Sequence, residues 1–289
     1  MVRQGVRYTP VCDLLINLMK VATLLLGGLS SAVALAAPHP RVVSINPCVD
    51  AVLVRIAEPQ QIAGISHYSQ DPRASSIAPE IARRFHSTAG TAEEVIALAP
   101  ELVISGPHVS PATIRALERL HMPLLKLGVP ESVAESLTQI RQLGAMVGAP
   151  ERGEALIAQI EIALAAARPP DRQLIDALIW QRGGLVPGAG TLADELLRRT
   201  GYRNLSAAYG LQKWDVLPLE YLIATPPAVV FSVSSDESEH DRMSGHPVLR
   251  GLAQRVAFRP YSFQLLQCGG PTIIDAVTQF AAIRRGLHR

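Results

Sequence analysis

The 289-residue sequence is poor in aromatic residues, in charge and in cysteine. Aromatic residues make up only 4% of the chain, so Ala, Leu, Ile and Val must fill the interior of one large domain or two ordinary ones. Charged residues make up 18% and the formal net charge is +2, which indicates neither a nucleic-acid-binding surface nor an acidic tail. Composition therefore predicts an aliphatic globular protein and selects no partner.

The common catalytic motifs are also absent. The sequence contains no GxSxG, HExxH or GxxxxGK[ST] pattern, so hydrolase, zinc-protease and phosphate-loop mechanisms have no support. These absences leave an enzyme without support and do not exclude one. The alternative from another class is a secreted metal-binding protein or enzyme that uses loop histidines, although no two of them have helical ligand spacing. These histidines are His67, His108, His240 and His246.

Three cysteines are present, and two of them lie beyond the N-terminal segment. Their spacing excludes a CxxC redox or zinc motif, and one pair does not make a disulfide scaffold. Cys48 and Cys268 each follow a predicted strand, one in each half of the chain. They could face each other across a cleft, where a disulfide would lock the lobes, although a separation across a cleft usually exceeds the limit of roughly 7 Å between Cα atoms.

The N-terminal segment has the features of an export signal. An apolar run over residues 21–37 follows Lys20 and ends in the small-x-small pattern Ala34-Leu-Ala36. The run is shorter than the roughly 20 apolar residues of a membrane span. We therefore expect residues 1–36 to be a cleaved signal peptide and the protein to be periplasmic, without a lipid anchor. Met19 is an alternative start.

One stretch of the sequence occurs twice. TAEEVIALAPELVIS at residues 91–105 aligns without a gap to PLEYLIATPPAVVFS at residues 218–232, and Glu93 then lies opposite Glu220. Each copy predicts a two-turn helix, a proline that ends it and a buried parallel strand. In the first copy Thr91 and Glu94 predict a capping box, which leaves Glu93 uncommitted. In the second, Pro218 suits the first helical position.

The spacing of the repeat predicts two related lobes, because solenoid periods are only roughly 20–50 residues. Strands and helices alternate in each half, as in parallel sheets flanked by helices. Residues 150–167 predict one long helix that joins the lobes. We expect an α/β protein with a ligand cleft between similar lobes. The expected domains are residues 37–149, a connecting helix over residues 150–168, and residues 169–289.

Three residues are candidates for ligand contact because they follow predicted strands, where parallel-sheet folds bind ligands: Tyr68, Arg182 and Trp214. The glycine-rich segment 182–190 also gives a weak GxGxxA match to a dinucleotide-binding fingerprint. That match fails because the preceding strand ends too early and no acid follows at the ribose position. A loop that leads into a helix cap explains these glycines better than a dinucleotide site does.

The chain resembles the class III periplasmic substrate-binding proteins of ABC importers, which carry iron-siderophore complexes and cobalamin. The resemblance covers essentially all of the chain after residue 36. Its most specific pieces are RVVSINPCVDAVL, IAGISHYSQDP, TAEEVIALAPELVI, GAGTLADELLRRTGYRNL and LPLEYLIATPPAVVF. In that family two α/β lobes are joined by one backbone helix, and the ligand lies between them.

The resemblance also implies roles for individual residues. The two glutamates that dock such proteins onto the membrane permease fall on Glu93 and Glu220. The tyrosine and tryptophan of the family's cobalamin site fall on Tyr68 and Trp214, whereas Arg182 replaces a phenylalanine. A cation there favours an anionic ferric siderophore, with cobalamin as the alternative ligand. The other expected ligand-binding residues are His67, Cys48 and Cys268. We expect a monomer with no catalytic residues, no metal site or cofactor of its own, and no nucleic-acid partner.

Overall fold

The first buried strand shows how local sequence sets the fold. In the computed structural model, β1 (Val42–Ile45) is followed at once by α2 (Pro47–Ile56), because the Asn46 side chain accepts a hydrogen bond from the Cys48 amide and Pro47 occupies the first turn. The helix therefore begins directly after the strand and its cap residue. The structure describes residues 39–234, 251–252 and 255–287. The expected signal peptide, His240 and His246 lie outside these ranges.

The N-terminal lobe is built on a parallel five-stranded sheet with the order β3-β2-β1-β4-β5. Its strands besides β1 are β2 (Ile62–Ser66), β3 (Ser87–Thr88), β4 (Leu102–Ser105) and β5 (Leu124–Lys126). Its other helices are the 3-10 turns η1 (Pro59–Gln61) and η2 (His67–Gln70), and α3 (Pro79–Ala82), α4 (Ala92–Ala97), α5 (Pro111–Arg119) and α6 (Val133–Met146).

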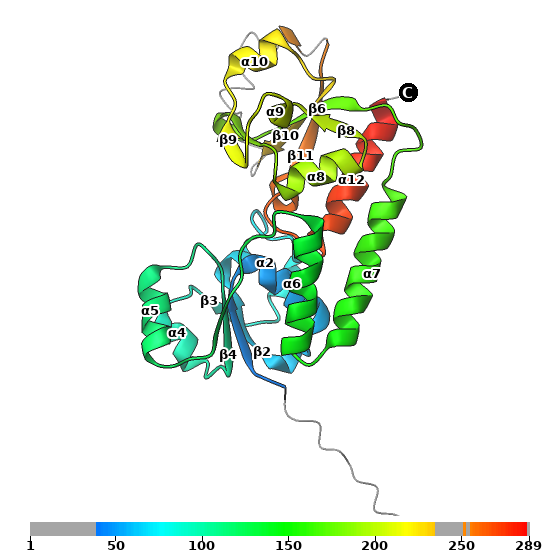
Figure 1. Ribbon diagram of the computed structural model, residues 1–289. Helices are drawn as coiled ribbons and strands as arrows, with labels where there is room; N and C mark the ends of the chain where they lie inside the picture. Colours follow the sequence, from blue (N-terminus) through cyan, green and yellow to red (C-terminus); the bar gives the residue numbers. More distant parts are fainter. Residues whose placement is uncertain (1–38, 235–250, 253–254, 288–289) are drawn as a thin grey trace, which may run out of the picture. The chain divides into compact units, whose positions relative to one another are not determined.

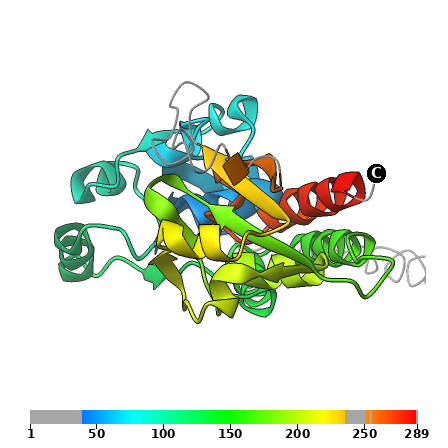
Figure 2. The same cartoon turned by 90° about the horizontal axis from the view of Figure 1, so that it is seen from above.

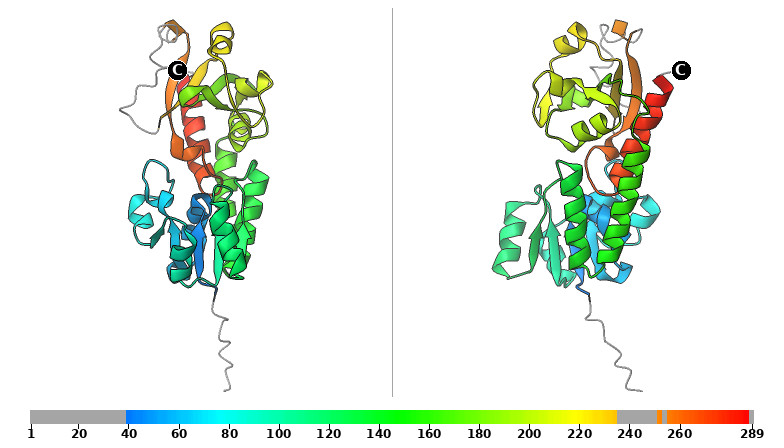
Figure 3. Two further views of the ribbon diagram at one scale, coloured as in Figure 1. Left: turned by 90° about the vertical axis from the view of Figure 1, so that its left-hand side faces the viewer. Right: turned by 45° about the vertical axis from the view of Figure 1, so that its right-hand side comes forward.

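Both faces of this sheet are buried, because successive apolar side chains along each strand point to opposite faces. Val43 and Val103 pack in one cluster with Val95 of α4 and Leu117 of α5. Their strand neighbours, which include Val42, belong to the large cluster that α2, α6 and α7 cover. Figures 1 and 3 show α4 and α5 on the opposite side of the sheet from α6 and α7.

The C-terminal lobe repeats this plan. Its parallel sheet has the order β11-β10-β6-β8, and a separate antiparallel pair joins β7 to β9. Its strands are β6 (Ile175–Trp180), β7 (Leu185–Pro187), β8 (Tyr202–Asn204), β9 (Trp214–Val216), β10 (Val229–Ser234) and β11 (Ala257–Ser262). Its helices are η3 (Arg182–Gly184), α8 (Leu192–Arg199), α9 (Leu205–Ala208), α10 (Leu219–Ala224), η4 (Phe263–Leu265) and α12 (Thr272–Leu287).

The internal repeat is confirmed at the level of topology. When β6 is laid on β1 and β10 on β4, the flanking strands β8 and β11 fall on β2 and β5. The two copies of the repeat then become α4–β4 and α10–β10, which stand at equivalent places in the two sheets. One helix-strand unit is thus used in the same way twice.

The predicted connecting helix is present as α7 (Pro150–Ala166), 17 residues long. Its length is about 25 Å at the α-helical rise. It packs against α6 and against α12, and Figures 1 and 2 show α7 and α12 running side by side. Both lobes lie within residues 39–289, which form one compact unit. Among the described residues, none of the helices has the length and apolarity that crossing a bilayer needs.

Candidate functional site

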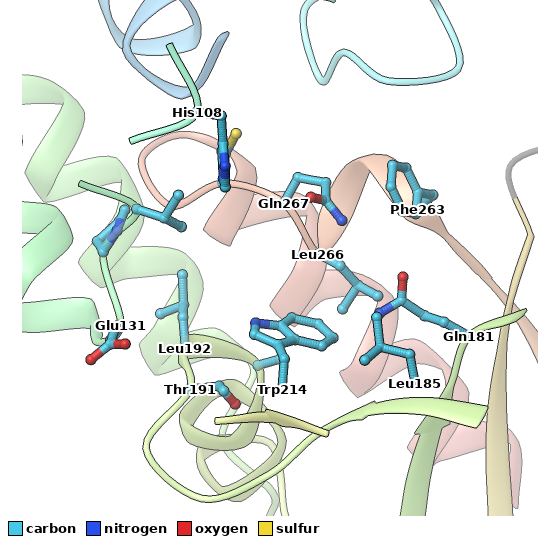
Figure 4. Close-up of a pocket in the computed structure, with 14 residues that line it drawn as sticks. His108, Glu131, Gln181, Leu185, Thr191, Leu192, Trp214, Phe263, Leu266 and Gln267 are labelled. Carbon is cyan, nitrogen blue, oxygen red and sulfur yellow. The ribbon is translucent and has the colours of Figure 1, made fainter. Parts of the chain in front are cut away.

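A cavity of about 510 Å³ opens at the carboxyl ends of strands from both lobes. This volume lies within the range of roughly 300–1,000 Å³ that is usual for small-molecule sites. The N-terminal lobe contributes His108 from the loop after β4 and residues 129–131 from the loop after β5. The C-terminal lobe contributes the segments around η3, the start of α8, β9 and η4 (Figure 4).

Apolar side chains form most of the cavity wall. They are Val129, Pro130, Leu185, Leu192, Ala193, Trp214, Phe263 and Leu266. The polar remainder is His108, Thr191, Gln181, Gln267 and Glu131, together with Cys268. Within the described part of the chain, this lining includes no lysine or arginine. The cavity therefore suits a largely apolar ligand with few charges to be matched.

The glycine-rich segment 182–190 positions Trp214. It contains β7, where the glycines predict a loop, and β7 pairs antiparallel with β9 so that Pro187 lies opposite Trp214. A Cβ on Gly188 would lie against the carbonyl oxygen of Leu211, so only glycine permits this backbone approach. Thr191 then caps α8 by accepting the Asp194 amide at 3.2 Å, as predicted. These glycines hold the tryptophan strand and form no dinucleotide fingerprint.

Lys213 anchors the same strand from the other side. It has a φ of 54°, which is unusual for a lysine, and hydrogen bonds to segment 188–189 hold its backbone on both sides. Its ammonium group contacts the Gly190 carbonyl oxygen at 3.2 Å and forms an ion pair with Glu131 of the N-terminal lobe. Both side chains are about half exposed, so this pair across the rim contributes little to stability.

His108 lies on a loop that the structure holds firmly. The Asn46 side chain donates to the Leu127 carbonyl oxygen at 3.2 Å, which ties the loops after β1 and β5 together. Gly106 packs against that asparagine, and Ser110 caps α5. Within the described chain, the His108 imidazole makes no hydrogen bond or ion pair. Figure 4 shows it pointing into the cavity.

The disulfide that the sequence leaves open is present. Cys48, at the start of α2, and Cys268, just before α12, form a disulfide with their Cα atoms 5.1 Å apart. The segment before α12 reaches into the N-terminal lobe, where the Gly270 amide donates to the Ser136 hydroxyl at 2.7 Å. A Cβ on Gly269 would lie 2.7 Å from that same hydroxyl oxygen, so glycine is needed for the approach. The lobes are therefore joined at this point as well as through α7.

A buried carboxylate holds the polar loop at residues 67–70 in place through hydrogen bonds. Asp50 of α2 is fully buried, and its Oδ2 accepts the Ser66 amide at 2.9 Å and the Ser69 hydroxyl at 2.6 Å. Burial raises the pKa of Asp50 to about 7, which these hydrogen bonds offset only in part. Between the two serines, Tyr68 is 55% exposed and its ring lies 4.0 Å from that of His67.

Of the predicted ligand-binding residues, the structure brings Trp214 and Cys268 into the cavity lining. His67, Tyr68, Arg182 and Cys48 are not among the lining residues, and their roles stay predictions. The sequence indicates His108 only as one of several loop histidines that could bind a metal. It predicts no role for the glutamines at residues 181 and 267. Their positions after strands were the available signal. Within the described ranges, three or more His, Cys, Asp or Glu side chains do not gather into a possible metal site.

The two repeated glutamates have equivalent surroundings. Glu93 and Glu220 are exposed in the first turns of α4 and α10, and neither makes a side-chain hydrogen bond or ion pair with another described residue. The pattern of burial repeats too, because Ile96 and Ile223 are 39% and 41% exposed. Each lobe thus offers an acid and an apolar side chain on one helix face.

Their helix caps differ in detail from the predictions. Thr91 accepts the Glu94 amide, but the Glu94 carboxylate binds the Ala89 amide and the Thr88 hydroxyl at 2.6 and 2.8 Å and does not complete the box. These hydrogen bonds lower the pKa of Glu94. In the second copy, Pro218 precedes the helix as its cap residue. Glu93 is left uncommitted, as expected.

Comparisons with known proteins agree with this architecture. The profile of a family described as periplasmic binding protein matches residues 42–253. The periplasmic heme-binding protein RhuT from Roseiflexus sp. RS-1 is 23% identical over 87% of this chain and 100% of that chain, with a TM-score of 0.73.

Two further structures share the fold. A periplasmic heme-binding protein from Pseudomonas aeruginosa is 24% identical over 84% of this chain and 92% of that chain, with a TM-score of 0.66. The vitamin B12-binding protein BtuF of Vibrio cholerae is 18% identical over 87% of this chain and 99% of that chain, with a TM-score of 0.66. Comparison with curated proteins gave no match.

Proposed function

Because the chain belongs to the periplasmic binding protein family, whose class III members serve ABC importers and are not enzymes, we propose that it captures a metal chelate in the cavity between its lobes and delivers it to a membrane permease. The observation that carries this proposal is the cavity itself. Both lobes contribute to it, its wall is mainly apolar, and its polar groups are few. Such a site suits the capture of an intact ligand.

Within this class we propose a metal tetrapyrrole as the ligand. The prediction of a ferric siderophore rests on Arg182, which is not a lining residue of the cavity. An anionic ferric chelate needs cations around it, whereas the lining offers a wall of Leu, Phe and Trp side chains. A macrocycle whose faces are apolar and whose charged groups stand at its edge matches such a wall. Heme-binding and vitamin B12-binding proteins are among the chains that share the fold.

Docking is assigned to Glu93 and Glu220. Exposed carboxylates contribute little to stability, so two at equivalent sites fit the recognition of a partner better than they fit folding. Delivery also requires export, for which residues 1–36 supply the signal. The disulfide between Cys48 and Cys268 supports an oxidising compartment such as the periplasm.

The test is a calorimetric titration of the mature protein with hemin, with cyanocobalamin and with a ferric catecholate siderophore. We expect one tetrapyrrole to bind with clearly higher affinity than the siderophore. Tight binding of the siderophore alone would refute the assignment of the ligand class. Absence of binding to every chelate would refute capture of a metal chelate.

Trp214 provides a variant pair for the same titration. Its side chain is 41% exposed and lines the cavity, so it has surface left to offer to a ligand. We expect Trp214→Ala to weaken tetrapyrrole binding by about 1–2 kcal/mol, roughly tenfold, through the loss of an aromatic contact. Trp214→Phe, which keeps an aromatic ring, should lose less. Equal affinity of Trp214→Ala and wild-type protein would remove Trp214 from the site.

A further inference from the structure

We propose that His108 is a ligand-binding residue whose imidazole coordinates the metal of the bound chelate. This inference rests on the proposed function and deepens it, because it states which chelates the cavity favours. A metal with an open axial position gains a bond to the protein. A metal that its chelator saturates gains nothing.

The placement of His108 carries the first step. The residue projects from the loop after β4 into the cavity, toward the side on which Leu192 and Trp214 lie (Figure 4). Most side chains that line the cavity are apolar. Across the described residues, nothing accepts from or donates to the imidazole, so both ring nitrogens are available. A free imidazole in such a cavity is a strong ligand for iron or cobalt.

The number of ligating groups carries the second step. A bare metal ion needs several protein ligands, and the described part of the chain has no group of three that would hold one. The other lining residue with a ligating side chain and no disulfide is Glu131, whose carboxylate is paired with Lys213. One imidazole is too little for a bare ion. It is sufficient for one axial position of a metal that a macrocycle already holds in its plane.

The two lobes supply complementary contacts for such a ligand. His108 belongs to the N-terminal lobe, and Trp214 belongs to the C-terminal lobe. A planar chelate that is coordinated from one side by imidazole presents its other face for stacking on an indole ring. The backbone pairing of β9 with β7 fixes Trp214, and the hydrogen bond from Asn46 to Leu127 braces the loops beside His108. The backbone at or beside both contact residues is therefore held in place before the ligand arrives.

The experiment compares hemin with metal-free protoporphyrin IX, which has the same shape but no metal to coordinate. We expect His108→Ala to weaken hemin binding by at least about tenfold and to leave protoporphyrin IX binding unchanged. The Soret band and the electron paramagnetic resonance signal of bound hemin should change in the variant. Added free imidazole should restore them.

The matched control is His121, an exposed histidine of the same lobe that does not line the cavity. Its φ is 53°, so His121→Asn is the suitable replacement, because asparagine tolerates that conformation. This variant should bind hemin with wild-type affinity and spectrum.

The outcomes separate this inference from the proposed function. If His108→Ala binds hemin with the affinity and spectrum of wild-type protein, His108 is not a metal ligand, although tetrapyrrole capture stands. An equal loss of affinity for hemin and protoporphyrin IX would show that His108 contributes packing alone. If wild-type protein binds neither compound, the tetrapyrrole proposal fails together with this inference.

Discussion

At the scale of single residues, the least ordinary group is the buried carboxyl of Asp50. Its Oδ2 accepts two hydrogen bonds, whereas its Oδ1 has no partner among the described residues. Burial raises its pKa from 3.8 to about 7. The folded protein therefore keeps this proton over the range from about pH 4 to about pH 7, in which the unfolded chain has already released it.

We therefore expect Asp50 to make stability fall as the pH rises from 4 to 7. Its contribution has the sign opposite to that of a salt-bridged acid, because its folded pKa is the higher one. Asp50→Asn keeps an oxygen acceptor for Ser66 and Ser69 and does not ionise. The variant should lose this slope and gain a few kcal/mol at pH 8, at about 1.4 kcal/mol per pKa unit.

Urea unfolding at several pH values measures this effect. Asp71→Asn is the control, because Asp71 is only partly buried and its hydrogen bonds with Arg73 lower its pKa, which places its titration below this window. The control should keep the wild-type slope between pH 4 and 7. A wild-type slope in Asp50→Asn would show that Asp50 is not the titrating group.

At the scale of elements, the segment from η4 to α12 determines how the lobes meet. It forms the disulfide, and the Thr272 hydroxyl lies 3.0 Å from that of Ser76. We expect the Cys48→Ser, Cys268→Ser double variant to lose up to about 5 kcal/mol of unfolding free energy, the loop-entropy value for the 220-residue separation. Reductant should destabilise wild-type protein by a similar amount and leave the variant unaffected. Equal stability of both proteins would show that the bond constrains nothing.

Elements with a strong local signal were predictable from sequence. Helix α7 and both copies of the repeat lie where helical spacing and proline placed them. Strands β7 and β9 were missed because Gly-rich sequence around β7 reads as loop, and only pairing with β9 makes it a strand. The sequence left the disulfide undecided for a related reason. Its geometry depends on a close approach between residues 220 positions apart, which local patterns do not encode.

The candidate site was predictable only in outline. Trp214 was predicted because it was expected to follow a strand, where parallel-sheet folds bind ligands. The importance of His108 becomes visible only when loops from both lobes line one cavity. Arg182 also follows a strand but is not among the lining residues of this cavity, so its role stays a prediction. Sequence located the end of each sheet that holds the site, and tertiary structure selected the side chains.

At the scale of the whole molecule, duplication places an exposed acid on each lobe. We expect the Glu93→Lys, Glu220→Lys double variant to abolish uptake of the chelate and to leave binding in solution unchanged, because neither residue lines the cavity. Each single variant should show uptake between that of wild-type protein and that of the double variant. Uptake by cells and calorimetry on purified protein measure the two effects.

The control for docking is a pair of exposed glutamates on α7, Glu151 and Glu161. Changing both to lysine alters the net charge by the same amount and should leave uptake intact. Normal uptake by the Glu93→Lys, Glu220→Lys variant would exclude these acids from docking. Weaker chelate binding by that variant would place them in the pocket.

The disulfide also makes a closed covalent ring of everything between Cys48 and Cys268, and α7 lies within that ring. A single protease nick in α7 therefore leaves the two fragments covalently attached. On a non-reducing gel the nicked protein should migrate as one species, and reduction should release two. Severing the connecting helix does not free the lobes until the sulfur bridge is opened as well.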